Sequence, residues 1–219
     1  TGVPRRHLMT PATRASSLLT TDLDRAVDAL RGGGLVAMPT ETVYGLAVLP
    51  QPAALQALMV AKQRSPEKGI PLLIDGLSQV EELVMVVPAA RRLALSLWPG
   101  PLTLVLPLRQ GQSLPTLLTG GRDTLALRVP DHAVPRALAR SLGPIATTSA
   151  NRSGEDAART ASELVDAVGA SLALVLDDGP VGLGVASTVV AVAGDGSARI
   201  LRLGALPRSE IEALVAESR

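Results

Sequence analysis

The sequence has no cysteine and is poor in aromatic residues and histidine. Without cysteine there can be no disulfide, no thiolate nucleophile and no cysteine-ligated metal. His7 and His132 are the only histidines, which excludes a histidine-rich metal site. Tyr44 and Trp98 are the only aromatic side chains, so the stacking platforms that bind single-stranded RNA are not expected.

Net charge and long hydrophobic runs are lacking too. The 219 residues carry a formal net charge of +1, which gives no overall electrostatic attraction to nucleic acid. No apolar run approaches the ~18 residues needed to cross a bilayer, so we expect a cytoplasmic protein with no membrane partner. Residues 1–21 contain three arginines and no acidic residue, and we expect a loosely ordered leader there. At 47% hydrophobic, residues 22–219 can bury one full core, which predicts a single domain.

Hydrophobic periodicity predicts helices and strands that alternate along the chain. Apolar residues at helical spacing indicate helices at 22–31, 53–64, 78 onward, 88–97, 133–142, 160–168 and 209 onward. Short apolar or alternating runs indicate strands at 35–38, 70–74, 102–108, 123–129, 144–147, 172–176, 187–192 and 199–203. Segments 110–121 and 179–184 are predicted to be loops. This order predicts an α/β protein with helices packed on a mixed sheet.

Local capping signals refine the helix starts. Thr20 or Thr21 is predicted to cap the helix at 22–31, and Asp131 is predicted to cap the helix at 133–142. Ser78 with Glu81 has the spacing of a capping box, which favours a helix from residue 78.

The segment 61–69 contains both lysines of the chain, Lys62 and Lys68, whereas the other cationic side chains are arginines apart from the two histidines. Two lysines within seven residues indicate a need for a compact ammonium group, and phosphate sites often combine lysine with arginine, here Arg64. The alternative is a helix C-terminus whose cations complement the helix dipole.

A second polar segment, 147–154, contains Asn151, the only asparagine. It follows a buried apolar strand, where ligand crevices open in α/β sheets. Hydroxyl and carboxamide groups at such a strand end can bind phosphate oxygens or a nucleotide, although the same residues also form ordinary turns. Ser149 has no histidine partner in prospect, which disfavours a hydrolase triad.

Two further positions could bind a ligand. Thr40 and Thr42 flank Glu41 at a strand exit, where they could hold a small polar ligand or form a satisfied turn. Arg128 ends an apolar strand, and burial of its charge requires a carboxylate partner from the protein or from a ligand. The sequence contains no phosphate-binding G-x-x-x-x-G-K-[ST] loop and no G-x-G-x-x-G turn.

Together these segments resemble the YrdC-like threonylcarbamoyl-AMP synthases in their short, single-domain form. The resemblance runs from about Ala26 to Leu214. It rests on seven pieces, PTETVYGL at 39–46, KQRSPEKG at 62–69, WPGPLTLVLP at 98–107, DTLALRVPDH at 123–132, TSANRSG at 148–154, STVV at 187–190 and ILRLGAL at 200–206. The family pattern K-x-R followed by S-x-N implies four catalytic residues, Lys62, Arg64, Ser149 and Asn151.

The resemblance implies an activity and a fold. The enzyme would join L-threonine, bicarbonate and ATP to give threonylcarbamoyl-AMP and pyrophosphate, with Mg²⁺ bound through the ATP phosphates and not by the protein. Its product would serve threonylcarbamoyladenosine formation on tRNA through downstream tRNA threonylcarbamoyltransferase proteins. The implied fold is a YrdC/RibB-like twisted mixed sheet with a large concave site, which makes residues 22–219 a YrdC-like catalytic domain.

The family's binding residues can be carried over position by position. The implied ATP contacts are Arg64, Lys68, Thr124, Ser149 and Arg202. The implied threonine contacts are Thr42, Arg128, Thr147 and Ser187. Two departures from the family pattern are Ser65, which precedes Pro66 after K-x-R, and Leu203, where the family commonly has proline after arginine.

Two other functions are open at this point. One is an RNA-binding or ribosome-maturation factor that uses the basic site as a groove for tRNA or double-stranded RNA. The near-zero net charge and the scarcity of aromatics count against it. The other is a related domain that adenylates plain carbamate.

Overall fold

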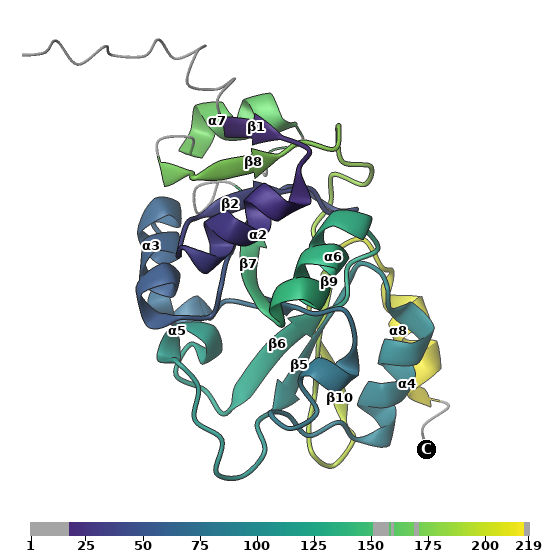
Figure 1. Cartoon of the computed structure of the whole chain (residues 1–219). Coiled ribbons are helices and arrows are strands. Elements are labelled where there is room, and N and C mark those ends of the chain that lie inside the picture. The colour runs from purple at the N-terminus through teal and green to yellow at the C-terminus, as the bar shows by residue number, and fades with distance from the viewer. Residues whose placement is uncertain (1–17, 151–157, 159, 169–170, 217–219) are drawn as a thin grey trace, which may run out of the picture.

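The computed structural model describes residues 18–150, 158, 160–168 and 171–216. Its strands form one ten-stranded sheet in the order β1-β8-β2-β3-β7-β4-β6-β5-β9-β10, with parallel and antiparallel pairs (Figure 1). The strands are β1 (Leu19–Thr20), β2 (Val36–Met38), β3 (Gly45–Val48), β4 (Leu72–Leu73), β5 (Leu102–Pro107), β6 (Thr124–Arg128), β7 (Ile145–Ser149), β8 (Leu174–Leu176), β9 (Thr188–Val192) and β10 (Ala198–Arg202). The predicted mixed α/β fold is confirmed.

The helices flank this sheet. They are α2 (Leu23–Arg31), α3 (Pro52–Lys62), α4 (Pro88–Leu97), α5 (Thr116–Thr119), α6 (Ala133–Leu142), α7 (Ala161–Val168) and α8 (Arg208–Ala216), with short 3₁₀ turns η1 (Pro66–Lys68) and η2 (Leu77–Gln79). None of the helices in the described ranges is long and apolar enough to cross a membrane. Asn151 and residues 1–17 of the expected leader lie outside the described residues.

One face of the sheet is covered by a large apolar core along its length. The buried leucines of α3 and α4 pack there with every second residue of β5 and β6, such as Leu104 and Leu127. These two residues are direct partners in the antiparallel β5–β6 pair, so they lie on the same side.

The opposite face is covered over only part of its width. Helices α2 and α6 pack there on the β8, β2, β3 and β4 strands through a second core that includes Leu30, Val36, Leu138 and Leu174 (Figure 1). Farther along the same face, β6 presents Thr124, Ala126 and Arg128 and β5 presents Thr103 and Val105 to a cavity. Because side chains alternate between faces, the polar set is the outward half of strands whose other half is core.

The predicted helix from residue 78 is wrong. Residues 77–79 form the 3₁₀ turn η2, and turns follow. The Glu81 carboxylate pairs with Arg91 at 2.9 Å instead of closing a capping box, and the Glu81 carbonyl accepts from Arg109 Nε at 2.6 Å. Long-range partners therefore take the groups that a helix would have used.

Several smaller expectations also differ from the structure. Strand β3 was not predicted, and helix α5 lies inside the predicted loop 110–121. Asp22 caps α2 by accepting from the amides of Asp24 and Arg25, and His132, not Asp131, caps α6. Two residues of the expected leader, Leu19 and Thr20, form β1 beside β8.

Candidate active site

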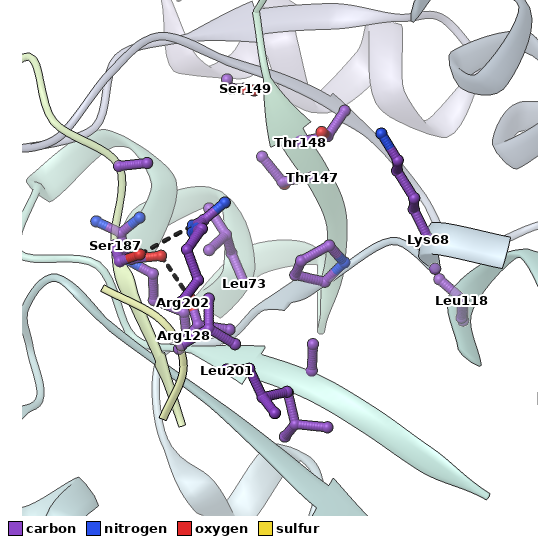
Figure 2. A pocket seen from close by; sticks show the side chains of 18 of the residues that line it. Lys68, Leu73, Leu118, Arg128, Thr147, Thr148, Ser149, Ser187, Leu201 and Arg202 are labelled. Atoms are coloured by element: carbon purple, nitrogen blue, oxygen red, sulfur yellow. Dashed lines mark hydrogen bonds between the residues drawn. The ribbon is translucent and has the colours of Figure 1, made fainter. Parts of the chain in front are cut away.

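The uncovered part of the sheet face forms the floor of a cavity of about 860 Å³. Nine of the eleven residues implied as site residues line it: Thr42, Arg64, Lys68, Thr124, Arg128, Thr147, Ser149, Ser187 and Arg202. They come from segments far apart in the sequence. Figure 2 shows Arg128, Arg202 and Ser187 gathered on one side of the cavity and Lys68 on the other, with Thr147 between them.

Arg128 lies at the end of β6 and has three neighbours. Its Nε donates to the Gly100 carbonyl at 3.2 Å and its Nη2 donates to Thr42 Oγ1 at 3.1 Å. The Glu41 carboxylate supplies the expected anionic partner, with Oε1 2.7 Å from Nη2. This contact is an ion pair, and no other group in the described ranges donates a hydrogen bond to either Glu41 oxygen. We regard it as a contact between charges.

The Thr40–Thr42 turn is held by its own hydroxyls. Thr40 Oγ1 accepts from the amides of Thr42 and Val43, each at 3.2 Å, and donates to the Val43 carbonyl at 2.7 Å. Thr42 Oγ1 lies 2.8 Å from Thr40 Oγ1. Both alternatives raised by the sequence therefore apply, because the turn is internally satisfied and still presents Thr42 to the cavity.

Ser187 lies at the start of β9, next to two groups that fix its position. Its Oγ is 2.8 Å from Thr103 Oγ1, and its carbonyl accepts from Arg202 Nη2 at 2.9 Å. Both Thr103 and Arg202 line the cavity. The hydroxyls and the guanidinium together form a polar wall along β5, β9 and β10.

The Arg64 end of the cavity is strongly cationic. Arg64 Nε and Nη2 donate to the Gly69 carbonyl at 3.2 and 2.9 Å, which folds the lysine-containing segment back on itself. Burial, and next the charge of Arg202, lower the pKa of Arg64. Burial, and next the charge of Arg128, lower the pKa of Arg202. Cations that repel one another in a cavity create a site suited to a polyanion.

Lys62 occupies a different place from the other cations. It is only 2% exposed and is not among the described residues that line the cavity. Its Nζ donates to the Ser149 carbonyl at 2.5 Å and lies 3.4 Å from Ser149 Oγ. Burial, followed by the charges of Arg64 and Lys68, lowers the pKa of Lys62 to about 8. Lys62 thus supports the end of β7 from behind the cavity wall.

Several cavity residues were not predicted. Thr103, Arg122 and Arg199 line it. Glu41, which pairs with the lining residue Arg128, was noted only as the neighbour of two threonines. Thr103 could have been found, since it is the single polar residue in the apolar run 102–107. The others depend on pairings between distant segments, for which the sequence carries no local signal.

Comparison with known proteins gives the family. The sequence model of Sua5, YciO and YrdC proteins, described as "Telomere recombination", matches residues 28–204. The chain belongs to the Sua5/YciO/YrdC family. The resemblance inferred from the sequence pieces is thereby confirmed.

Individual relatives of the family carry more specific names. A protein of Idiomarina loihiensis named threonylcarbamoyl-AMP synthase is 45% identical over 66% of this chain and 80% of its own length. One of the same name from Bacillus subtilis is 38% identical over 87% of this chain. The crystal structure of P. abyssi Sua5 complexed with L-threonine has a TM-score of 0.81 and 34% identity, and covers 95% of this chain. The chain spans 56% of the Bacillus protein and 59% of the P. abyssi chain.

Proposed function

We propose that this chain is an L-threonylcarbamoyladenylate synthase, which converts L-threonine, bicarbonate and ATP into threonylcarbamoyl-AMP and pyrophosphate. The observation that carries the proposal is the single cavity that brings together nine of the residues implied by the family resemblance. The names of the relatives support the same activity. The cavity offers one strongly cationic region for a triphosphate and one region with paired charges for an amino acid.

In this proposal Arg64, Lys68 and Arg202 bind the ATP phosphates, with Thr124 and Ser149 as neutral contacts. Positioning and electrostatic stabilisation supply most of the catalysis in such phosphoryl chemistry. The amine of threonine and bicarbonate form a carbamate with loss of one water molecule. A carbamate oxygen then attacks the α-phosphorus of ATP, and pyrophosphate leaves. The carbamate is anionic, so the attack itself needs no base. Ser149, which the family pattern pairs with Asn151, lies at the end of β7. Lys62 Nζ contacts both its carbonyl oxygen and its hydroxyl oxygen there.

A divalent metal fits the cavity as a companion of ATP. Glu67 is the one carboxylate among the described residues that line it, and no group of three candidate metal ligands occurs in the described ranges. We therefore assign Mg²⁺ to the ATP phosphates, where it would neutralise their charge. The protein's own part is to hold the triphosphate with its cations.

The threonine contacts in this proposal are Arg128 for the carboxylate and Thr42, Thr147 and Ser187 for the remaining polar groups. A site built to hydrogen-bond a hydroxyl rejects an analogue that lacks it more strongly than an apolar pocket rejects a methyl group. Serine should therefore be a weaker substrate, and valine essentially none.

The decisive experiment is to incubate the protein with ATP, Mg²⁺, bicarbonate and labelled L-threonine and to look for labelled threonylcarbamoyl-AMP and released pyrophosphate. Serine and valine are tested in parallel, and a reaction without bicarbonate is the control. No labelled adenylate from any of the amino acids would contradict the proposed activity. A valine product equal to that of threonine would contradict the amino-acid assignment.

The biological setting is part of the proposal. The product would be used for threonylcarbamoyladenosine formation on tRNA by downstream threonylcarbamoyltransferase proteins, in the cytoplasm. Direct contact with tRNA or double-stranded RNA stays a prediction, and the cavity cations Arg122 and Arg199 are the first residues to test for it.

A further inference from the structure

The Glu41 side chain lies next to Arg128, one of the residues that line the cavity. It is 15% exposed, and both carboxylate oxygens are buried. A buried carboxylate is unfavourable unless it is paired, so its place beside Arg128 calls for an explanation. Its close neighbour of opposite charge is Arg128, 2.7 Å away.

The backbone around Glu41 is firmly held, so its place beside Arg128 does not reflect a poorly supported segment. The amide of Leu183 donates to the Glu41 carbonyl at 3.1 Å, and the amide of Gly184 donates to the Thr42 carbonyl at 2.8 Å. The hydroxyl of Thr40 secures the turn from the other side. The fold thus fixes a carboxylate next to the Arg128 guanidinium, which lines the cavity.

The charge of Glu41 offsets the charge of one of the cations that line the cavity. The lining cations are Arg64, Lys68, Arg122, Arg128, Arg199 and Arg202. Arg128 is the one with a carboxylate within 4 Å among the ion pairs of the described residues. Arg128 therefore differs from the other lining cations in having a fixed negative charge beside it.

An α-amino acid is itself neutral overall, because it carries a carboxylate and an ammonium group on one carbon. A carboxylate bound by Arg128 places the adjacent ammonium within a few ångströms of Glu41. A phosphate or a simple carboxylate at the same place would meet the negative charge of Glu41 without an ammonium group of its own to offset it. Resting on the proposed function, we propose that Glu41 is a specificity-determining residue, which makes the Arg128 region select a zwitterionic amino acid over a plain anion.

The test compares two ligands that differ in the ammonium group alone. L-threonine and 3-hydroxybutanoate share the carboxylate and the hydroxyl, and calorimetric titration gives the affinity of each for wild-type protein and for Glu41→Gln. Glutamine keeps the shape of glutamate and removes its charge. We expect the affinity ratio of threonine to 3-hydroxybutanoate to fall roughly tenfold or more in Glu41→Gln, the worth of one charge-assisted contact.

Two control variants and one replacement variant separate this role from a structural one. Glu41→Asp keeps the charge and should retain most of the ratio. Glu81→Gln removes the carboxylate of a surface pair with Arg91 and should leave the ratio unchanged. If circular dichroism shows that Glu41→Gln does not fold, Glu41→Ala takes its place in the comparison.

The outcomes are distinct. Wild-type protein that does not bind L-threonine would overturn the proposed function and this assignment with it. Threonine binding by the wild type, with equal changes for both ligands in Glu41→Gln, would overturn the assignment alone. A ratio that falls with the charge and returns with aspartate supports it.

Discussion

Two parts of one sheet face differ in this protein, because one is covered by helices and the other is open to a cavity. Over β8, β2 and β3, apolar side chains such as Val36 and Leu174 are sealed by α2 and α6. Over β6 and β5, the same face presents Thr124, Arg128 and Thr103 to an open cavity. The backbone pairing continues across both parts. What differs is whether a helix covers the strands, and the side chains follow that difference.

The comparison separates stability from function in space. The covered part buries apolar area, which is the main source of folding free energy. The open part gathers cations that repel one another, such as Arg64 and Arg202, and this repulsion opposes folding. Functional sites commonly break the local rules that the rest of a fold obeys.

The largest effect on stability should come from the covered part. Leu30 of α2 is fully buried in the core that α2 and α6 share. Leu30→Ala should reduce the free energy of unfolding by ~2–5 kcal/mol, because it removes transferred apolar area and leaves a cavity. Urea denaturation measures this loss. The matched control is Leu201→Ala on the open part, where the side chain is 46% exposed and the loss should be below ~1 kcal/mol. Similar losses in both variants would remove the contrast between the two parts.

The largest effect on activity should come from the open part. Arg64→Ala should lower the rate of pyrophosphate release by ~10²–10³, the usual cost of removing one preorganised charge donor. Its free energy of unfolding should not fall as it does in Leu30→Ala, since the lost cation is repelled by Arg202. Arg31→Ala, at the exposed end of α2, is the control for loss of a positive charge. Turnover near wild type in Arg64→Ala would exclude it from the phosphate site.

The smallest effect concerns Lys62, which contacts Ser149 at the end of β7 and changes charge at mildly alkaline pH. Its pKa of about 8 means that the ammonium that supports Ser149 is half lost near pH 8. We expect the rate to fall to about half there and to keep falling at higher pH. In Lys62→Arg the charge persists, so this decline should move to higher pH.

Stability should respond in the opposite direction. The unfolded chain holds the Lys62 proton up to about pH 10.5, whereas the folded chain releases it near pH 8. Between these values the unfolded state binds more protons, so the contribution of Lys62 to stability rises with pH. Denaturation of wild type and Lys62→Arg at pH 7 and pH 9.5 measures it. The same pH profile of the rate in wild type and Lys62→Arg would contradict the role of Lys62 in activity. The same change in the free energy of unfolding between pH 7 and pH 9.5 would contradict its role in stability.

The sequence predicted the parts of this molecule that depend on local chemistry. The alternation of β6 was visible, and so was the need of Arg128 for a carboxylate partner. The identity of that partner was not, because Glu41 and Arg128 are brought together only by sheet pairing. The helix predicted from Ser78 and Glu81 was wrong for the same reason. The distant residues Arg91 and Arg109 bind the carboxylate and the carbonyl of Glu81. The position of Lys62 behind the wall is likewise a property of packing and not of its motif.

The parallel pairing of β5 with β9 has a kinetic consequence. Leu102 lies opposite Thr188, and the cavity wall at Ser187 and Thr103 exists only after these distant segments have met. Contacts of such long sequence separation form slowly, because the loop between them must close first. The site is therefore complete only after this pairing has formed. Ligands of the cavity can recognise only the finished fold, and each would raise the apparent midpoint of thermal unfolding by an amount that grows with the logarithm of its concentration divided by its Kd.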